Sequence, residues 1–368
     1  MNNSIKNSFK IAFLFLGMFV GAGFCTGQET FQYFNRNNGN LLSLAFALFL
    51  LILNFYIVLK KIYEDRIDSF DEYVTKTSSK VIGRIFKIFI SIIAFVAFFG
   101  MHSAAGSLFK QIFKTSNSYT AGVLTLSFLC FIVFILDAKG LLMVNSFMSP
   151  LKIIGIPILT LIAIKKGNIS LFHDKSFLKE LSLPSGLFTF FNSFVSAACY
   201  VSFNAIASGS VLVSFKNLFD KKTIKLGAIL GGTLICVMHL VIWLAFKLHF
   251  KEIEKIEIPM LYFANTIGGI CKIIYLILVC SGTFTTAVSM GFALINQFKI
   301  KDLKQRLFYS ILLCIIALPL AFIKFSSIIG KIFGFMGYVG FAWMFITIFD
   351  YLKNIMPKEI ISKLFKTK

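Results

Sequence analysis

Acidic residues are scarce in this sequence. Only 16 Asp and Glu stand beside 37 Lys and Arg in 368 residues, and charged residues of both signs make up 14% of the chain. A soluble protein of this length would carry more charge, so the composition excludes an ordinary soluble domain. Hydrophobic residues make up 57% of the chain, Phe alone contributes 46, and the mean hydropathy is +0.84. This composition is typical of a helical membrane protein.

Motifs of the common enzyme and metal sites are also missing. The seven cysteines form no CxxC pair, which argues against a zinc site and against a disulfide framework. The sequence contains no P-loop, no nucleophile elbow and no HExxH motif. We expect a protein that is not an enzyme and that holds no resident cofactor.

Apolar segments long enough to cross a bilayer recur along the chain. A spanning helix needs about 20 apolar residues. Ten segments approach or exceed this length, at approximately 9–34, 41–60, 84–113, 119–136, 141–164, 186–215, 223–247, 270–297, 306–323 and 327–352. We therefore expect an all-α integral membrane protein with ten transmembrane helices in one structural domain.

Positive charge is concentrated in the segments that share a side of the membrane with the N-terminus. Under the positive-inside rule, this bias predicts that both termini are cytoplasmic. Basic ends that face anionic lipid also account for the net charge of +21. We expect the lipid bilayer, and no nucleic acid, as the partner of this charge.

The predicted spans fall into two equal halves. Five precede the polar segment 165–185 and five follow it, so the two halves insert with opposite topology. Inverted repeats of this kind are typical of secondary transporters. We expect a cytoplasmic tail at 1–8, a first repeat at 9–164, an outer loop at 165–185, a second repeat at 186–352 and a basic cytoplasmic tail at 353–368.

Helix-breaking sequence occurs in the first and sixth predicted spans. The first contains GMFVGAGFCTGQET at 17–30, and the sixth contains AACYVSFNAIASGSVLVSF at 197–215. Interrupted helices free backbone groups that hydrocarbon cannot satisfy, so they survive only beside a polar cavity. The alternative is that the small residues serve close helix packing. We expect both helices to be discontinuous and to form a binding site where they meet.

Two short motifs in these segments resemble those of a known transporter superfamily. Val20-Gly21-Ala22-Gly23-Phe24 is similar to the Gly-Ser-Gly-Ile-Phe element in the first helix of amino acid–polyamine–organocation transporters. Tyr200-Val201-Ser202-Phe203-Asn204-Ala205 resembles their sixth-helix Tyr-x-Gly-Phe-Asp-Ala, with Asn in place of Asp. The longer GAGFCTGQE resembles the start of YkvI-type bacterial membrane proteins. The resemblance implies the LeuT fold, a five-plus-five inverted repeat in which a bundle rocks against a scaffold.

The resemblance also implies a substrate site at the two breaks. In that fold, freed N–H groups of the first helix bind a substrate carboxylate with help from the helix dipole, and carbonyls of the sixth helix bind the amino group. His102 in the third span is a weaker candidate, because a lone histidine more often serves as a packing hydrogen-bond partner. The candidate substrate-binding residues are Gly21, Ala22, Gly23, Phe24, Cys25, Thr26, Tyr200, Ser202, Phe203, Asn204 and His102.

Glu29 places a carboxylate beside the first break. The pattern Thr26-Gly27-Gln28-Glu29 predicts a capping box that starts a new half-helix inside the membrane. Three roles stay open for Glu29: a helix cap alone, an outer gate or proton-binding group, or a recognition group for a cationic substrate. The free energy needed to hold a charge inside a membrane favours a functional role.

Two groups compete for the site of the coupling ion. In sodium-coupled members of the fold, the ion lies between first-helix carbonyls and an eighth-helix carbonyl that two hydroxyls follow. The residues with this spacing are Gly17, Val20, Gly282, Thr285 and Thr286. Oxygen ligands suit a hard cation, although the threonines could equally bond back to their own helix.

Lys152 is the rival to sodium. It lies in the middle of the fifth predicted span, where its side chain cannot easily reach either surface. Proton-coupled relatives carry a fifth-helix lysine whose ammonium group occupies the sodium position. Exchange or uniport without a coupling ion is the third option.

These features together predict a cation-coupled secondary transporter, a symporter of the bacterial cytoplasmic (inner) membrane that works by alternating access. Its expected substrate is an amino acid or a related small amine solute, coupled to Na⁺ or H⁺. The alternative is a non-transporting membrane sensor that keeps the binding site. The sequence sets neither the solute, the direction of transport nor the oligomeric state.

Overall fold

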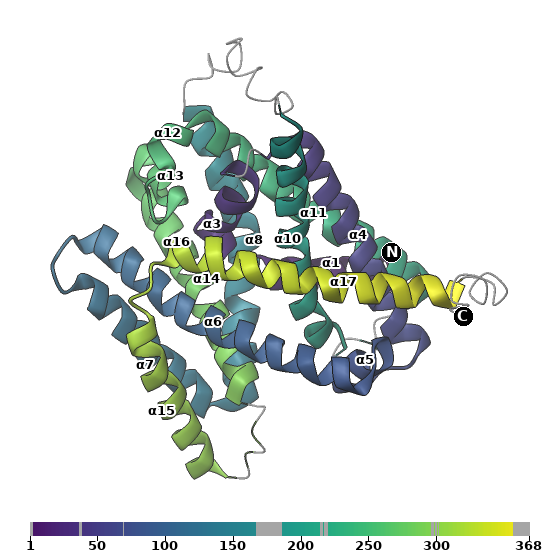
Figure 1. The fold of residues 1–368 in the computed structure, drawn as a ribbon. Helices are drawn as coiled ribbons and strands as arrows, with labels where there is room; N and C mark the ends of the chain where they lie inside the picture. Colours follow the sequence, from purple (N-terminus) through teal and green to yellow (C-terminus); the bar gives the residue numbers. More distant parts are fainter. Residues whose placement is uncertain are drawn as a thin grey trace.

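The protein is all-helical (Figure 1). The computed structural model describes residues 3–36, 39–68, 70–166, 186–213, 216, 220–295, 298, 300 and 302–355, and no β-strand occurs among them. Most of the predicted loop at 165–185 and of the predicted tail at 353–368 lies outside these described residues.

Long helices form from the apolar runs of the sequence. Within the described ranges, seven helices are long and apolar enough to cross a bilayer. They are α4 (Leu41–Glu64), α6 (Lys80–Phe113), α7 (Ser118–Ile135), α11 (Lys221–Leu248), α14 (Gly269–Ile295), α15 (Leu303–Leu320) and the continuous stretch Phe325–Asn354. This last stretch comprises α16 (Phe325–Ser327), the π-helical η4 (Ile328–Phe333) and most of α17 (Gly334–Ile355). The chain is therefore an integral membrane protein with helical spans.

The other predicted spans are helical as well. Segment 9–34 contains most of α1 (Asn3–Phe19) and then α2 (Ala22–Cys25), α3 (Gln28–Thr30) and the start of the π-helical η1 (Phe31–Asn35). Segments 141–164 and 186–215 correspond to α8 (Asp137–Lys166) and α10 (Leu187–Leu212). The shorter helices are α5 (Phe70–Thr77), α12 (Phe250–Ile253) and α13 (Pro259–Ile267).

The helices pack as two groups. α1 lies against α11, α4 packs on α10 and α11, and α10 packs on α17. In the second group α6 lies against α7 and α14, and α15 lies beside α7 (Figure 1). α8 contacts α14, α11 and α13, so it joins the groups, and α2 packs on α14.

Large apolar side chains on the outer helix faces are left uncovered by protein. Ile88 on α6, Ile277 on α14 and Ile315 on α15 are 62%, 58% and 58% exposed. Lipid tails are as apolar as these side chains, so a bilayer covers them without exposing them to water. The exposed faces agree with the spans inferred from length and hydropathy.

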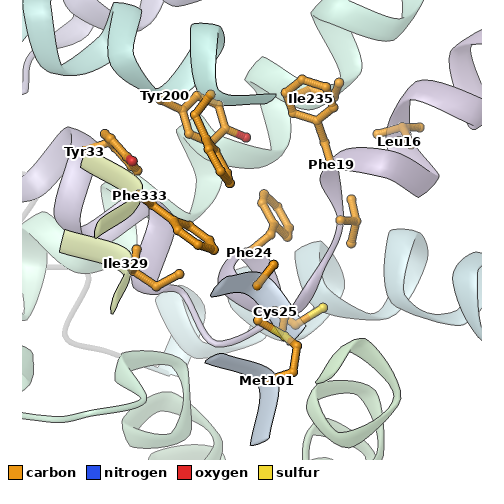
Figure 2. Close-up of a cluster of buried hydrophobic side chains, with 14 of the residues drawn as sticks. Leu16, Phe19, Phe24, Cys25, Tyr33, Met101, Tyr200, Ile235, Ile329 and Phe333 are labelled. Carbon is orange, nitrogen blue, oxygen red and sulfur yellow. The ribbon is translucent and has the colours of Figure 1, made fainter. Parts of the chain in front are cut away.

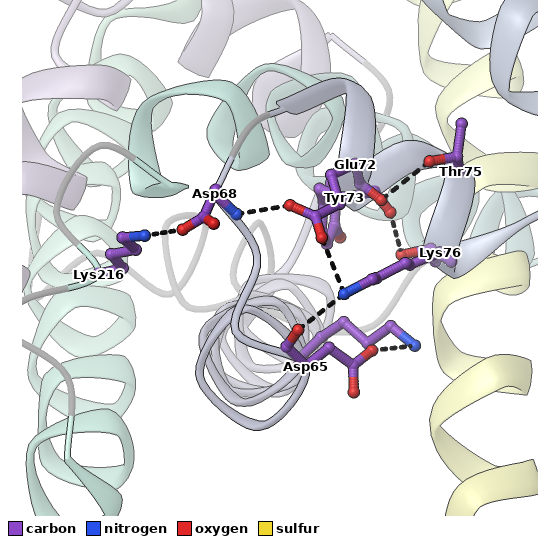
Figure 3. Close-up of polar contacts among 9 residues, drawn as sticks. Asp65, Asp68, Glu72, Tyr73, Thr75, Lys76 and Lys216 are labelled. Carbon is purple, nitrogen blue, oxygen red and sulfur yellow. Dashed lines mark hydrogen bonds and ion pairs between the residues drawn. The ribbon is translucent and has the colours of Figure 1, made fainter.

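A network of charged groups organises the connection between α4 and α6 (Figure 3). The ammonium group of Lys76 donates to the carbonyl oxygen of Asp65 and pairs with Glu72, each at 2.8 Å. The other Glu72 oxygen accepts from the amide of Asp68 at 2.8 Å, and Asp68 pairs with Lys216. The network is largely solvent-exposed, so it orients the connection rather than supplying much stability.

The predicted break in the sixth span is wrong. α10 runs without interruption from Leu187 to Leu212. The Nδ2 group of Asn204 donates to the carbonyl of Tyr200 at 3.0 Å, and the Ser202 hydroxyl donates to the carbonyl of Gly337 on α17 at 2.7 Å. These polar side chains bond to helix backbone, so they do not need an unwound segment.

Asp220 caps α11 and also ties it to the start of α1. Its carboxylate accepts from the amides of Lys222 (3.0 Å) and Thr223 (2.9 Å), from the Thr223 hydroxyl (2.6 Å) and from the Ser4 hydroxyl (3.2 Å). Donation by Thr223 is the main reason that the pKa of Asp220 lies below its usual value. The cap therefore favours the ionised carboxyl.

Replacing this cap tests the contact between α1 and α11. We expect Asp220→Ala to lower stability by about 1 kcal/mol or more, seen as a lower melting temperature in detergent. Because the folded-state pKa is lowered, the contribution is present at neutral pH and is lost as pH falls through that pKa. The control is Asp302→Ala. Asp302 is the N-cap of α15, and its carboxylate accepts from the amide of Gln305. Equal losses in the two variants would contradict the tie between α1 and α11.

Candidate functional site

The first apolar segment is interrupted in the middle of the protein. α1 ends at Phe19, Gly21 is extended (φ −87°, ψ −167°), and α2 restarts the helix at Ala22. The amide of Gly21 donates to the carbonyl of Phe19 at 2.8 Å, so a tight turn replaces the helical bond. Such a restart leaves the first N–H groups of α2 without partners in their own helix.

Helix α14 supplies partners for this interruption. The amide of Ala22 donates to the hydroxyl of Thr286 at 3.2 Å, and the Tyr275 hydroxyl donates to the carbonyl of Cys25 at 3.0 Å. Gly21 lies so close to α14 that a Cβ placed on it would be 2.9 Å from the Thr286 hydroxyl. The interruption is therefore fitted to α14 and is not a frayed end.

A sharp turn at Gly27 follows α2. Gly27 has a φ of +80°, in the left-handed region that favours glycine, and a Cβ there would collide with Phe246. The preceding carbonyl, of Thr26, accepts from the amide of Met260 on α13 at 3.1 Å. This turn sets the direction of α3 and η1.

The predicted capping box does not form. The Thr26 hydroxyl donates back to the carbonyl of Ala22 at 2.8 Å and accepts from the amide of Gln28 at 3.4 Å. α3 has Gly27 at its N-cap and no side-chain cap. Because the left-handed turn intervenes, the Glu29 carboxylate lies against α2 and does not return to the amide of Thr26.

Glu29 is buried against the interrupted segment. Its side chain is 6% exposed, and a Cβ placed on Gly23 would collide with Oε1. Oε2 has no hydrogen-bond partner in the described part of the chain, and none of the ion pairs found there includes Glu29. The carboxylate therefore reaches the interruption without a protein partner for one of its oxygens.

Aromatic rings surround the same region (Figure 2). The Tyr33 and Tyr200 ring centroids are 5.7 Å apart, and Phe19 meets Tyr200 edge-on at 6.1 Å. Phe203, a predicted site residue, stacks on Phe333 at 4.4 Å. Figure 2 shows Phe24 in the middle of this cluster. The hydroxyl of Tyr33 is buried and has no partner among the described atoms.

A buried polar chain beside the cluster was not predicted. The Thr30 hydroxyl lies 2.9 Å from Nδ1 of His239, and Nε2 of that ring lies 2.5 Å from the Tyr200 hydroxyl. His239 is 1% exposed and comes from α11. The signal in the sequence is a single histidine inside the predicted span 223–247, in the second repeat. This chain links α3, α10 and α11.

Lys152 lies beside the interruption on the side of α14. The side chain is 2% exposed, and its ammonium group donates to the Thr285 hydroxyl at 2.6 Å. That hydroxyl donates in turn to the carbonyl of Gly282 at 3.1 Å. A Cβ on Gly282 would lie 2.8 Å from the sulfur of Cys25, so α2 and α14 are in direct contact here.

This arrangement bears on the predicted sodium residues. Thr285 already accepts from a lysine ammonium, and Thr286 accepts from the amide of Ala22. Val20 is buried directly after the end of α1, and Gly17 lies in the last turn of that helix. The Thr285 hydroxyl is thus already bonded to an ammonium group in the place where the predicted set of Gly17, Val20, Gly282, Thr285 and Thr286 would need it as a sodium ligand.

The remaining predicted site residues have contacts elsewhere. Nδ1 of His102 donates to the carbonyl of Phe98 at 2.9 Å, and its ring packs on Phe98 in the same helix. Ser202 and Asn204 bond to backbone as described above. The interruption brings together Gly21, Ala22, Gly23, Phe24, Cys25, Thr26 and Glu29, with Tyr200 nearby. The hydrogen bonds found for His102 and Ser202 do not include these residues, and Asn204 bonds to the Tyr200 carbonyl within its own helix.

The fit of Glu29 against Gly23 is open to a direct test. We expect Gly23→Ala to destabilise the protein by about 1–3 kcal/mol, because the new methyl group forces Glu29 to move. Gly17→Ala is the matched control, since a Cβ at Gly17 meets nothing within 4 Å. Adding Glu29→Ala to Gly23→Ala should recover part of the lost melting temperature. Additive losses in the double variant would reject the contact.

Comparison with known sequences gives relatives along nearly the whole chain. No family model matches. The membrane protein YkvI of Bacillus subtilis (strain 168) is 26% identical over 351 residues, which is 94% of this chain and 96% of YkvI. YyaD of the same organism is 21% identical over 327 residues, covering 88% of this chain and 91% of YyaD.

Solved structures of transporters share the fold. MhsT in complex with L-phenylalanine aligns with a TM-score of 0.59 at 14% identity, over 86% of this chain and 80% of MhsT. A manganese transporter of Eremococcus coleocola gives 0.61 at 11% identity, over 93% and 78%. A Na⁺-coupled sialic acid symporter gives 0.54 at 14% identity, over 92% and 84%. The chain is therefore a LeuT-fold membrane protein, similar to YkvI along almost its entire length.

Proposed function

We propose that the protein is a secondary transporter that moves an amino acid or a related small amine solute by alternating access. The observation that carries the proposal is the interrupted first segment, with backbone donors and a buried carboxylate in the interior of a LeuT-fold chain. Interrupted backbone at membrane depth is typical of substrate sites in such transporters. Similar folds in transporters of different solutes support the class and leave the solute open.

The proposal includes the topology expected from the sequence. We propose ten spans in two inverted repeats of five, with both termini cytoplasmic, in a bacterial cytoplasmic membrane. In this arrangement the repeats differ, because the first segment is interrupted and α10 is not. The solute would then depend mainly on the first segment and on rings that α10 and η4 present to it.

The segment between α12 and α13 makes contacts that suit a gate in this transporter. The side-chain amide of Gln28 donates to the carbonyl of Glu257 at 2.7 Å. The Glu257 carboxylate accepts from the amide of Ser326 at 2.6 Å and from the Ser326 hydroxyl at 3.0 Å. One residue thus joins the half-helix beyond the interruption to the start of α16. We propose that these bonds hold one side of the site closed and must break for access from that side.

Protons are the coupling ion that the geometry supports best. Lys152 bonds to Thr285, one of the two hydroxyls that a sodium ion would need. The Lys152 amine can bind and release a proton. It would be positively charged beside Thr285 when protonated and neutral when deprotonated. We propose that Lys152 takes the place of sodium and that proton exchange at its ammonium group accompanies transport.

Uptake into proteoliposomes tests the transport function. Radiolabelled phenethylamine, cadaverine, phenylalanine and lysine serve as probes, with an imposed proton gradient, a sodium gradient or no gradient. We expect at least one probe to accumulate under the proton gradient, by about tenfold per pH unit if one proton moves with each solute. Probe binding without flux under any gradient would reject the transporter and favour the sensor.

The role of Lys152 is tested in the same vesicles. We expect Lys152→Met to reduce accumulation to the level without a proton gradient, while exchange of labelled for unlabelled probe continues. Lys272→Met on the exposed face of α14 makes the same change away from the site and should behave like wild type. Accumulation in Lys152→Met that still follows the proton gradient, or wild-type uptake that follows sodium alone, would reject proton coupling at Lys152.

A further inference from the structure

Two unpartnered oxygen atoms lie on one face of the segment that follows the interruption. Glu29 Oε2 and the Tyr33 hydroxyl are both buried and lack hydrogen-bond partners among the described atoms. Glu29 is 6% exposed and Tyr33 is 4% exposed. Residues four apart in a helix are neighbours on the same face. Buried polar atoms without partners are rare, so the pair calls for an explanation.

Among the residues that the structure describes, the Glu29 carboxylate has no positively charged partner. The ion pairs found in the described part of the chain join other side chains, and the one buried lysine nearby bonds to Thr285. A buried charge is normally paired, because removing it from water is unfavourable. A cation from outside the chain would supply what Glu29 lacks.

The surroundings suit an organic cation better than a small metal ion. The rings of Tyr33 and Tyr200 lie 5.7 Å apart, and Phe24 packs edge-on against His239 at 5.0 Å. Aromatic faces attract ammonium groups, and they do so more strongly when water is excluded. The described residues also contain no group of three His, Cys, Asp or Glu side chains that could hold a metal ion.

The same carboxylate opposes a solute that carries its own carboxylate. Glu29 lies against Gly23, beside the interruption to which the proposed function assigns the solute. Two carboxylates in one buried site repel each other, and this repulsion is strong where the dielectric constant is low. An amine that lacks a carboxylate meets only attraction from Glu29.

We infer that Glu29, with the rings of Tyr33, Tyr200 and Phe24, recognises the ammonium group of a small organic amine without a carboxylate. The inference rests on the proposed function, because the rings pack together in this conformation and a solute enters only when they part. It narrows the substrate class from amino acids and amines to amines alone. Glu29 is then the residue that sets specificity.

The experiment compares solutes that differ only in a carboxylate. Phenethylamine is set against phenylalanine, and cadaverine against lysine, with the purified full chain in detergent. Dissociation constants come from isothermal titration, and melting temperatures provide a second measure of binding. We expect each amine to bind about tenfold or more tightly than its parent amino acid.

Variants at Glu29 assign this preference to the carboxylate. We expect Glu29→Gln to weaken amine binding by about tenfold or more and to remove the preference over the amino acid. Glu29→Asp keeps the charge and should keep the sign of the preference. Glu252→Gln, on an exposed position of α12, is the matched control and should leave both constants unchanged. A ligand-free melting temperature for each variant verifies that it folds.

Several results would overturn the inference. These are equal or tighter binding of the amino acids by wild type, a preference for amines that survives in Glu29→Gln, or no binding of any probe by wild type. A change confined to the pH dependence of uptake in Glu29→Gln would assign a proton to Glu29 instead. Amine binding without uptake would leave the inference standing and reject transport. Gradient-driven uptake of amino acids but not of amines would support transport and reject the inference.

Discussion

Lipid offers no hydrogen bonds, and this constraint shapes the centre of the molecule. A helix interrupted at membrane depth must find partners for its freed backbone groups inside the protein. Here the Thr286 hydroxyl accepts from the amide of Ala22, and the Tyr275 hydroxyl donates to the carbonyl of Cys25. The amide of Met260 donates to the carbonyl of Thr26. The interruption is consequently held by α13 and α14 together. Movement of either helix must change the bonds of the interrupted segment.

Two buried side chains of opposite charge type flank the interruption without pairing with each other. Glu29 lies over Gly23, whereas Lys152 lies by Thr285 on the side of α14. If the two side chains formed an ion pair, each charge would already be compensated and neither would require a charged ligand. Kept apart, each group can respond to its own partner. In the proposed transporter, this separation would allow solute recognition at Glu29 and proton exchange at Lys152 to be different events in one site.

Much of the fold could be predicted from the sequence, because long apolar runs in a membrane leave a chain little choice but helix. The glycines at 21 and 23 correctly marked the region of the interruption, and the isolated Lys152 marked the polar contact with α14. The sixth span defeated the same reasoning, since Asn204 and Ser202 bond to helix backbone. The capping-box motif failed because the left-handed turn at Gly27 turns Glu29 elsewhere. The contact between His239 and Tyr200 could not be predicted, because residues on different helices that meet in space have no characteristic spacing in the sequence.

The π-helical segments η1 and η4 contact each other across the aromatic cluster. A π turn holds about one residue more than an α turn, and such turns are frequent at functional sites. If the π turn changes into an α turn, the extra residue leaves the turn. The helix on one side of the turn then rotates by about 100° around its axis relative to the other side. Tyr33 and Phe333 lie in these segments, so a register change would swing their rings while the helix axes stay in place. The interior could thus be reshaped by twisting alone, with no helix moving sideways through the lipid.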